Sequence, residues 1–151
     1  MSDAPMTITI RRLKSEDHDQ WIPLWHGYLT FYEASVEPAV TKETWRRLLS
    51  DTEQPHGFCA VDENGRLVGI VHYLFHRVTW SISERCYLED LFVDPDVRGG
   101  GVGKKLIDAV YAEADAQDAD QTYWLTQEFN ERARRLYDHV ATATPFIKYK
   151  R

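Results

Sequence analysis

The sequence predicts an α/β domain with a mixed sheet, and three observations indicate it. The chain has 151 residues, close to the size of about 150 residues that is usual for one domain. In the first half, Asn64-Gly65 separates two apolar runs, which is a hairpin signal. In the second half, strand patterns alternate with amphipathic helical patterns, as is typical of α/β domains. Because no repeat or linker-like stretch interrupts the chain, we expect one domain over residues 1–151.

The first half predicts strands and two helices. Residues 7–11 alternate between polar and apolar side chains, which is typical of a strand. Large apolar residues from Trp21 to Tyr32 recur at helical spacing. Since proline is tolerated only in the first helical turn, Pro23 predicts that this helix starts near Gln20. The other expected elements of this half are a helix from Thr41 and strands at 58–61 and 67–75.

The second half predicts three strands and two further helices. A strand is expected at 86–93, and it ends at Asp94-Pro95 because proline removes a backbone donor. An amphipathic helix follows, and Asn130 is well placed to cap another. The apolar residues that mark these two helices are Leu106, Ile107, Val110 and Ala114, then Ala133, Leu136, Tyr137 and Val140. Strands are expected at 122–126 and 146–149.

The composition excludes some classes of protein. With 43% hydrophobic and 13% aromatic residues, the chain carries too much apolar surface to be disordered. There are 18 Lys and Arg against 24 Asp and Glu, giving a net charge of −6. This charge argues against a nucleic-acid partner or an anionic membrane and is compatible with a cationic partner. A solubilising surface explains the same charge equally well.

Cysteines, histidines and the N-terminus give expectations about location and metals. Cys59 and Cys86 make neither a disulfide scaffold nor a CxxC site, and residues 1–5 lack a signal-peptide pattern. No run approaches 18 apolar residues, so we expect a cytoplasmic protein with no membrane segment. His72 and His76 are four residues apart in an expected strand, without a third ligand, so we expect no metal.

The most informative stretch is the glycine-rich turn at 98–104, which joins a strand to a helix. The first N–H groups of a helix lack internal partners, and the helix dipole places positive charge there. Glycines let a phosphate approach this backbone closely, so the turn predicts a pyrophosphate site. The plainer alternative is a flexible turn that only starts the helix.

Two common nucleotide motifs do not fit this turn. The dinucleotide pattern G-x-G-x-x-G fails because Lys104 occupies the third glycine position after Gly99 and Gly101. The P-loop pattern fails because Arg98 replaces its first glycine and Lys105 replaces the magnesium-binding Ser or Thr. These mismatches disfavour NAD, ATP and a nucleotide phosphotransferase.

Arg98-x-x-Gly101-x-Gly103 resembles the R/Q-x-x-G-x-G/A signature of the GNAT superfamily of coenzyme-A-dependent N-acetyltransferases. Residues 87–93 resemble that family's central strand, and Asn130-x-x-Ala133-x-x-Leu136-Tyr137 resembles its second motif. The resemblance is greatest to the polyamine (diamine) branch, which also has Leu-Glu-Asp before the central strand. It implies the acyl-CoA N-acyltransferase fold, in which a mostly antiparallel sheet is flanked by helices. Residues 141–146 depart from the family, since they lack its Gly-Phe.

The resemblance also implies the ligands and their sites. Acetyl-CoA is the expected co-substrate, with no metal. Backbone groups of the central strand are expected to pair with its pantetheine arm like an added strand, and the Leu91 N–H to polarise the thioester carbonyl. Asn130 has two readings, as a helix cap and as a ligand of that arm. The expected cofactor-binding residues are Leu91, Phe92, Val93, Arg98, Gly99, Gly100, Gly101, Val102, Gly103, Lys104, Asn130 and Tyr137.

Acetyl transfer to an amine needs a base and an acid. An alkylamine with a pKa near about 10.4 must lose a proton first, and a departing thiolate benefits from a proton donor. By the resemblance, Glu89 is the candidate base and Tyr137 the candidate acid. Strand alternation places Asp90 on the face opposite Glu89. The alternatives are a solvated or ion-paired carboxylate for Glu89 and Asp90, and a core aromatic for Tyr137.

The acceptor is expected to be a primary amine of a small cationic metabolite. At helical spacing the aromatic stripe from Trp25 to Tyr32 is usually core, but in the polyamine branch a Tyr-Glu pair matching Tyr32-Glu33 lines the acceptor site. An acid beside aromatic rings suits a cation. Expected substrate-binding residues are therefore Tyr32, Glu33, Glu89 and Asp90. The alternatives are a protein lysine or N-terminus as acceptor, and a non-catalytic acyl-CoA-binding module. A homodimer is expected from the family alone.

Overall fold

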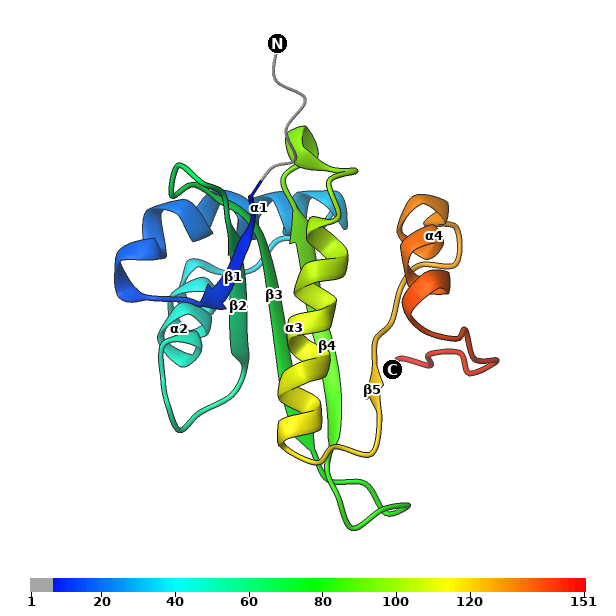
Figure 1. The fold of residues 1–151 in the computed structure, drawn as a ribbon. Coiled ribbons are helices and arrows are strands. Elements are labelled where there is room, and N and C mark those ends of the chain that lie inside the picture. The colour runs from blue at the N-terminus through cyan, green and yellow to red at the C-terminus, as the bar shows by residue number, and fades with distance from the viewer. Residues whose placement is uncertain (1–6) are drawn as a thin grey trace.

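The computed structural model describes residues 7–151, which form one five-stranded sheet flanked by helices (Figure 1). The strands are β1 (Thr9–Arg12), β2 (His56–Val61), β3 (Leu67–His76), β4 (Arg85–Val93) and β5 (Thr122–Tyr123), in this order across the sheet. The helices are α1 (His18–Phe31), α2 (Pro38–Leu48), α3 (Val102–Ala116) and α4 (Glu131–Val140), with short 3₁₀ turns η1 (Ser15–Asp17) and η2 (Pro95–Val97). All strand pairs are antiparallel except β4 and β5. The predicted mixed, mostly antiparallel fold is confirmed.

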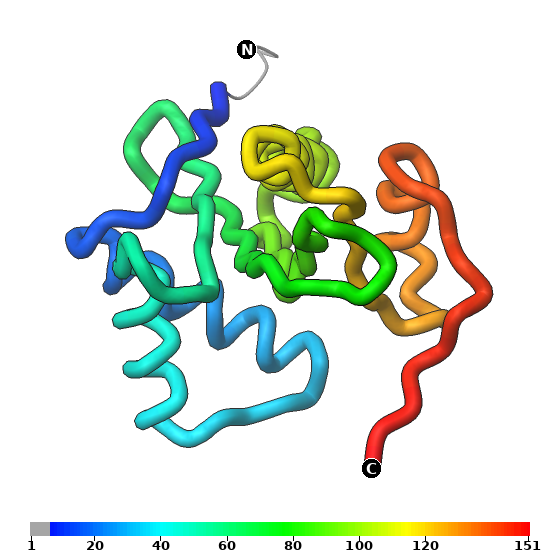
Figure 2. The backbone as a smooth tube through the Cα atoms, turned by 90° about the horizontal axis from the view of Figure 1, so that it is seen from below, coloured from blue at the N-terminus to red at the C-terminus, as the bar shows by residue number. Residues whose placement is uncertain are grey.

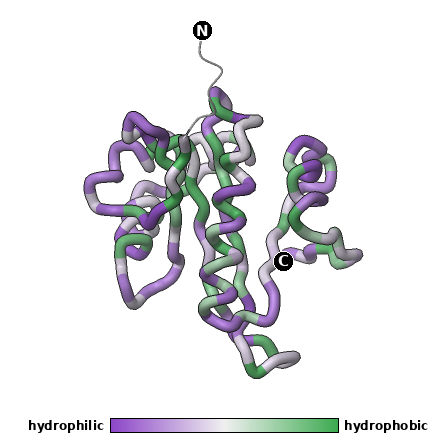
Figure 3. Tube along the Cα trace, viewed as in Figure 1, coloured by the Kyte–Doolittle hydropathy of each residue, from purple (hydrophilic) through white to green (hydrophobic). Residues whose placement is uncertain are grey.

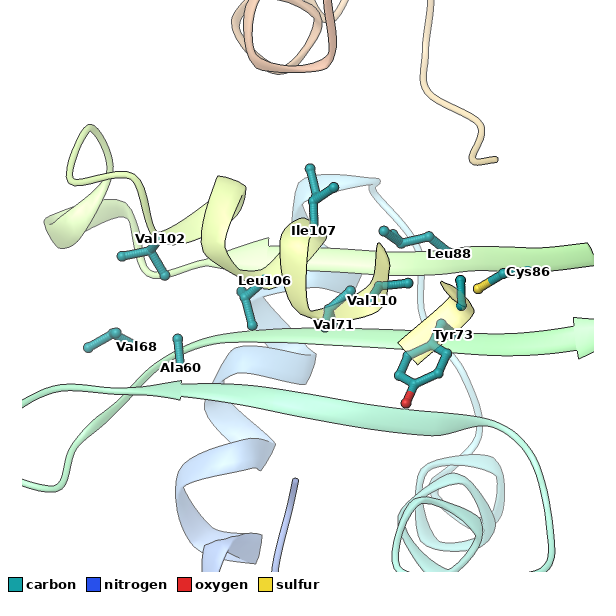
Figure 4. Close-up of a cluster of buried hydrophobic side chains, with 11 residues drawn as sticks. Ala60, Val68, Val71, Tyr73, Cys86, Leu88, Val102, Leu106, Ile107 and Val110 are labelled. Carbon is teal, nitrogen blue, oxygen red and sulfur yellow. The ribbon is translucent and has the colours of Figure 1, made fainter. Parts of the chain in front are cut away.

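The sheet has a hydrophobic core on each face. On one face α3 packs through Leu106 and Val110 against Val71 (Figure 4). On the other face α1 packs through Trp21 against Ile70. Neighbouring β3 residues thus point to opposite faces, as strand alternation requires. Figure 3 shows the same pattern, with hydrophobic strands in the interior and a hydrophilic loop between α2 and β2.

A β-bulge changes the alternation in β4. His72 pairs with Asp90 and Tyr73 pairs with Leu88, so Glu89 has no partner on β3. An extra residue of this kind bends the strand and re-aims the side chains that follow it. Asp90 consequently lies on the α1 face with His72, whereas uninterrupted alternation would place it on the same face as Leu88.

β4 and β5 separate soon after they meet. They pair only at Cys86–Thr122 and Tyr87–Tyr123, so the predicted strand at 122–126 is wrong beyond Tyr123. The chain leaves the sheet there, and the next residue, Trp124, packs its ring on Tyr137 of α4, with ring centroids 5.4 Å apart. Figure 1 shows β5 leading away from the sheet towards α4.

Two helix starts differ from the prediction because of prolines. Helix α1 begins at His18, so Pro23 lies inside it. Burial of Trp21 and Trp25 on either side of Pro23 keeps the helix continuous, although the proline removes one backbone hydrogen bond. Helix α2 begins at Pro38 and not at Thr41. Proline favours the first helical position because its φ angle already fits a helix.

The predicted strand at 146–149 is wrong. Residues 141–151 form no helix or strand in the structure, and Phe146, Ile147 and Tyr149 are 84%, 74% and 88% exposed. No strand of the described chain pairs with this segment, which lies beyond α4 at the edge of the molecule (Figure 2). None of the helices within residues 7–151 has the length and apolar character needed to cross a membrane. Residues 1–5, where a signal peptide was not expected, lie outside the described residues.

Candidate active site

A pocket of about 390 Å³ opens where β4 and β5 separate. Three parts of the chain form its walls: the C-terminal end of α1, the stretch from β4 to the first turn of α3, and one face of α4. The lining residues are Tyr28, Phe31, Tyr32, Leu91, Phe92, Val93, Arg98, Gly99, Gly101, Val102, Gly103, Lys104, Asn130, Arg132, Ala133, Leu136 and Tyr137.

The glycine-rich turn forms the end of the pocket at the start of α3. Gly99 and Gly101 have φ angles of 94° and 78°, a left-handed conformation that glycine adopts without strain. Gly101 is the N-terminal cap of α3, and no side chain within residues 7–151 caps this helix. The first N–H groups of α3 are therefore available to an anion, and the helix dipole favours one.

Helix α4 packs closely against this turn at Gly103. A Cβ atom added there would lie 3.1 Å from Leu136 Cδ2, closer than an ordinary van der Waals contact. Gly103 therefore lets α3 and α4 approach each other beside the pocket.

Two arginines add positive charge near the turn. Arg98 lies over the Phe92 ring at 5.3 Å and donates from Nε to the Val93 carbonyl at 3.1 Å. Burial lowers the pKa of Arg98, and the charge of Arg132 lowers it further. The two guanidinium groups are thus close enough to repel, and an anion between them relieves this repulsion. Lys104 instead pairs with Asp108 at 2.8 Å.

The backbone of β4 presents a free edge to the pocket. The Asp94 N–H donates to the Val68 carbonyl on β3, so the Val93 carbonyl points away from β3, where Arg98 reaches it. Because backbone groups alternate along a strand, those of Leu91 also point to this edge. β5 pairs no further than Tyr87, so the edge is open to an extended ligand.

Tyr137 projects from α4 into the pocket beside Tyr32. Burial and the neighbouring Tyr32 raise the pKa of Tyr137 to about 12. Its hydroxyl is therefore protonated at neutral pH and is able to donate a proton or a hydrogen bond.

The two acidic residues of β4 lie beside the aromatic end of α1. Tyr28 and Tyr32 have ring centroids 5.0 Å apart. Burial, and then the carboxylates of Asp90 and Glu89, raise the pKa of Tyr28, so both acids lie within electrostatic reach of its hydroxyl. The prediction that Asp90 lies on the face opposite Glu89 is wrong. The bulge interrupts the alternation, and both carboxylates lie near Tyr28.

Glu89 combines an exposed side chain with a perturbed carboxyl group. The side chain as a whole is exposed, yet protein atoms around the carboxyl remove part of its hydration. This loss of water, together with the negative charge of Asp90, raises the pKa of Glu89. A carboxylate with a raised pKa is a stronger base at neutral pH than an ordinary glutamate.

Most of the predicted cofactor-binding residues line the pocket, and Gly100 does not. Asn130 lines it and also caps α4, since its Oδ1 accepts from the Ala133 N–H at 3.4 Å. Of the predicted substrate-binding residues, Tyr32 lines the pocket, whereas Glu33, Glu89 and Asp90 are not part of its lining. Glu33 is exposed, just after α1.

Sequence reasoning missed other lining residues. Tyr28 and Phe31 belong to the aromatic stripe, which was interpreted mainly as core, and only its first residue, Trp25, is buried. Nothing in the sequence indicated that Arg132 lines the pocket, except that it stands next to Ala133, which belongs to the apolar stripe of α4. Within residues 7–151, no three His, Cys, Asp or Glu side chains gather as a metal site. Cys86 is buried and lies in the strand that was expected from residue 86.

The fold and the site define the class of protein. Among solved structures, the aminoglycoside N-acetyltransferase AAC(6')-Iy in complex with CoA has a TM-score of 0.80 at 19% identity, covering 100% of this chain and 98% of that chain. A ribosomal-protein-alanine N-acetyltransferase from Brucella melitensis has a TM-score of 0.79 at 23% identity, covering 95% and 98%. At these identities the likeness shows a shared fold, that of N-acetyltransferases.

Sequence comparison then gives the family. Residues 18–141 match the Acetyltransferase (GNAT) family. The D-amino-acid N-acetyltransferase HPA3 of Saccharomyces cerevisiae is 37% identical over 145 residues, which are 95% of this chain and 90% of that protein. The thialysine N-epsilon-acetyltransferase of Bos taurus is 34% identical over 90 residues, 60% of this chain and 48% of that protein. This chain belongs to the GNAT family and is an N-acetyltransferase, with acetyl-CoA as its acetyl donor.

Proposed function

We propose that this enzyme moves an acetyl group from acetyl-CoA to a primary amine of a small cationic metabolite by direct attack. The observation that carries the proposal is the pair of carboxylates, Glu89 and Asp90, beside the Tyr28 hydroxyl at the aromatic end of the pocket. A carboxylate beside aromatic rings attracts a cation by charge pairing and by cation–π attraction.

The donor is proposed to lie along the pocket with its pyrophosphate at the glycine turn. The free N–H groups at the start of α3 and the cations Arg98 and Arg132 suit that group. The free edge of β4 suits the extended pantetheine arm, which pairs like an added strand. The Leu91 N–H is the proposed donor to the thioester carbonyl, since it points to the same edge.

The proton transfers are assigned to Glu89 and Tyr137. Glu89 accepts the proton of the amine, directly or through a water molecule, and its raised pKa suits this role. Tyr137 holds a proton at its hydroxyl for the departing thiolate, and its pKa of about 12 keeps that proton in place until it is needed. A module that only bound acyl-CoA would need neither group.

A D-amino acid is a second candidate acceptor, because HPA3 is named for this substrate and matches 95% of the chain. Such an acceptor carries a carboxylate next to its amine. The acidic pair on β4 favours an acceptor without a nearby negative charge. A lysine-like amino acid, such as the thialysine for which one relative is named, is intermediate between a D-amino acid and a polyamine, because its side-chain amine is farther from its carboxylate.

A panel of acceptors tests these alternatives. Thiol release from acetyl-CoA is measured with diamines and polyamines, thialysine, several D-amino acids, and peptides with a lysine or a free N-terminus. The highest kcat/KM is expected with a diamine or polyamine. A higher kcat/KM with D-amino acids would transfer the assignment to them, and a preference for peptides would favour protein acetylation. No turnover with any amine, despite acetyl-CoA binding, would leave only the binding module.

Assembly and location complete the proposal. We propose that the whole chain works as one domain and forms a homodimer in the cytoplasm. The exposed apolar side chains of Phe146, Ile147 and Tyr149 support a partner surface near the C-terminus. The buried, unpaired thiols of Cys59 and Cys86 suit a reducing compartment. Sedimentation analysis of the purified protein tests the dimer, and a monomer at micromolar concentration would contradict it.

A further inference from the structure

A buried histidine on β3 connects the core of α1 with the acidic pair on β4. The His72 side chain is completely buried, with 0% exposure, whereas that of Asp90 is 13% exposed. His72 Nδ1 lies 2.8 Å from Asp90 Oδ2. On the other side of the ring, Trp21 Nε1 donates to His72 Nε2 at 3.1 Å. The three side chains form a continuous chain of hydrogen bonds whose only exposed end is Asp90.

Trp21 fixes the tautomer of His72. An indole N–H only donates, so His72 Nε2 must be the acceptor. The single proton of the neutral ring is therefore on Nδ1, from where it donates to Asp90 Oδ2. A proton added at Nε2 would face the indole N–H and break this bond. The ring of His72 is thus oriented so that Nδ1 donates to one carboxylate oxygen.

The bulge explains why such a support is needed. Asp90 follows the unpaired Glu89, at a point where the bulge bends the strand and re-aims its side chains. The hydrogen bond from His72 sets the direction of the Asp90 carboxylate. Tyr28 lines the pocket, and burial together with the nearby Asp90 carboxylate raises the pKa of its hydroxyl, so Asp90 lies close to the aromatic end of the pocket.

We propose that His72, locked in one tautomer by Trp21, is a positioning residue that aims the Asp90 carboxylate at the cationic acceptor. The inference rests on the proposed function, because it concerns how the same acceptor amine is held. Asp90 supplies the negative charge that attracts the ammonium group, and Glu89 beside it removes the proton. His72 touches neither substrate and acts only through Asp90.

Kinetics of four variants, with the acceptor that the panel identifies, test this role. His72→Phe removes the donor and keeps a ring in the core, whereas His72→Asn keeps an N–H near the Nδ1 position. Asp90→Asn removes the charge, and the double variant combines His72→Phe with Asp90→Asn. Val110→Ala, in the buried core on the other face of the sheet, is the matched control for a general loss of packing.

Losing a hydrogen bond to a charged group predicts a fall of about tenfold to a hundredfold in kcat/KM for the amine in His72→Phe. The KM for acetyl-CoA is expected to stay unchanged, and His72→Asn is expected to recover most of the loss. The double variant should be no slower than Asp90→Asn, because His72 works through that residue.

The inference is overturned if the losses of the two single variants multiply, or if Val110→Ala, at equal loss of thermal stability, reduces kcat/KM for the amine as much as His72→Phe. An NMR spectrum showing the His72 proton on Nε2 would also overturn it. The proposed function fails by a different result, since it requires the unmodified enzyme to acetylate a small cationic amine.

Discussion

Replacing Tyr137 with Phe tests the proposed acid, because it removes one hydroxyl and little else. The pKa of Tyr137 is about 12, which is about five units above neutral pH, so virtually every enzyme molecule holds this proton. General acid catalysis contributes roughly 10²- to 10⁴-fold in rate. A thiol with a pKa of about 8.5 is a fairly good leaving group, so the lower end applies. We expect kcat to fall about 100-fold, or about 2.7 kcal/mol.

The assay follows the release of free CoA with a thiol-reactive dye, at saturating amine and varied acetyl-CoA. The packing of ring 137 against Trp124 is kept in the variant, so the unfolding temperature and the KM for acetyl-CoA are expected to change little. A kcat within about twofold of the unmodified enzyme, well below the effect expected of a general acid, would refute the assignment. A matching fall in thermal stability would show that the hydroxyl serves the fold.

Three further changes have expected outcomes. In the unmodified enzyme, the acidic limb of the kcat/KM profile should lie above the pKa of an ordinary glutamate, about 4.3, because the pKa of Glu89 is raised. Glu89→Gln should lower kcat/KM and abolish this limb. An unchanged profile would exclude Glu89 as the base. Gly101→Ala places a side chain on a residue with a φ of 78°, which lowers the free energy of unfolding by about 1–2 kcal/mol. Thermal melts should show a lower unfolding temperature, and kinetics should show a higher KM for acetyl-CoA. Arg132→Ala should raise the KM for acetyl-CoA several-fold at low salt and less at high salt, while Arg47→Ala on α2 should not; equal effects of both would remove Arg132 from the site.

The local signals in the sequence were sufficient for much of the fold. The turn at Asn64-Gly65, the glycine-rich turn before α3 and the cap at Asn130 each depend on a few adjacent residues. The structure has all three where the sequence predicts them. The strand at 146–149 failed because strand formation needs a partner, and no strand of the described chain supplies one. Pro23 misled because buried tryptophans override the local cost of proline.

The site was harder to predict wherever it depends on register. Extra residues such as Glu89 leave no mark in the apolar pattern of a strand, so the new direction of Asp90 was not visible. For the same reason His72 was considered only as a metal ligand beside His76, since its partner lies on the neighbouring strand. Arg132 reaches the pocket only because α4 packs beside α3, and a single sequence contains little information about such packing.

The short pairing between β4 and β5 has a cost and a benefit that cannot be separated. The sheet forks after Tyr87 and Tyr123, and the backbone groups left without a strand partner in the fork are those that an acyl donor's arm is able to use. A substitution that extended the pairing of β5 with β4 beyond Tyr87 and Tyr123 would add backbone hydrogen bonds and stabilise the protein. The same substitution would fill the slot and end acetyl transfer, so improved stability at this point means lost activity.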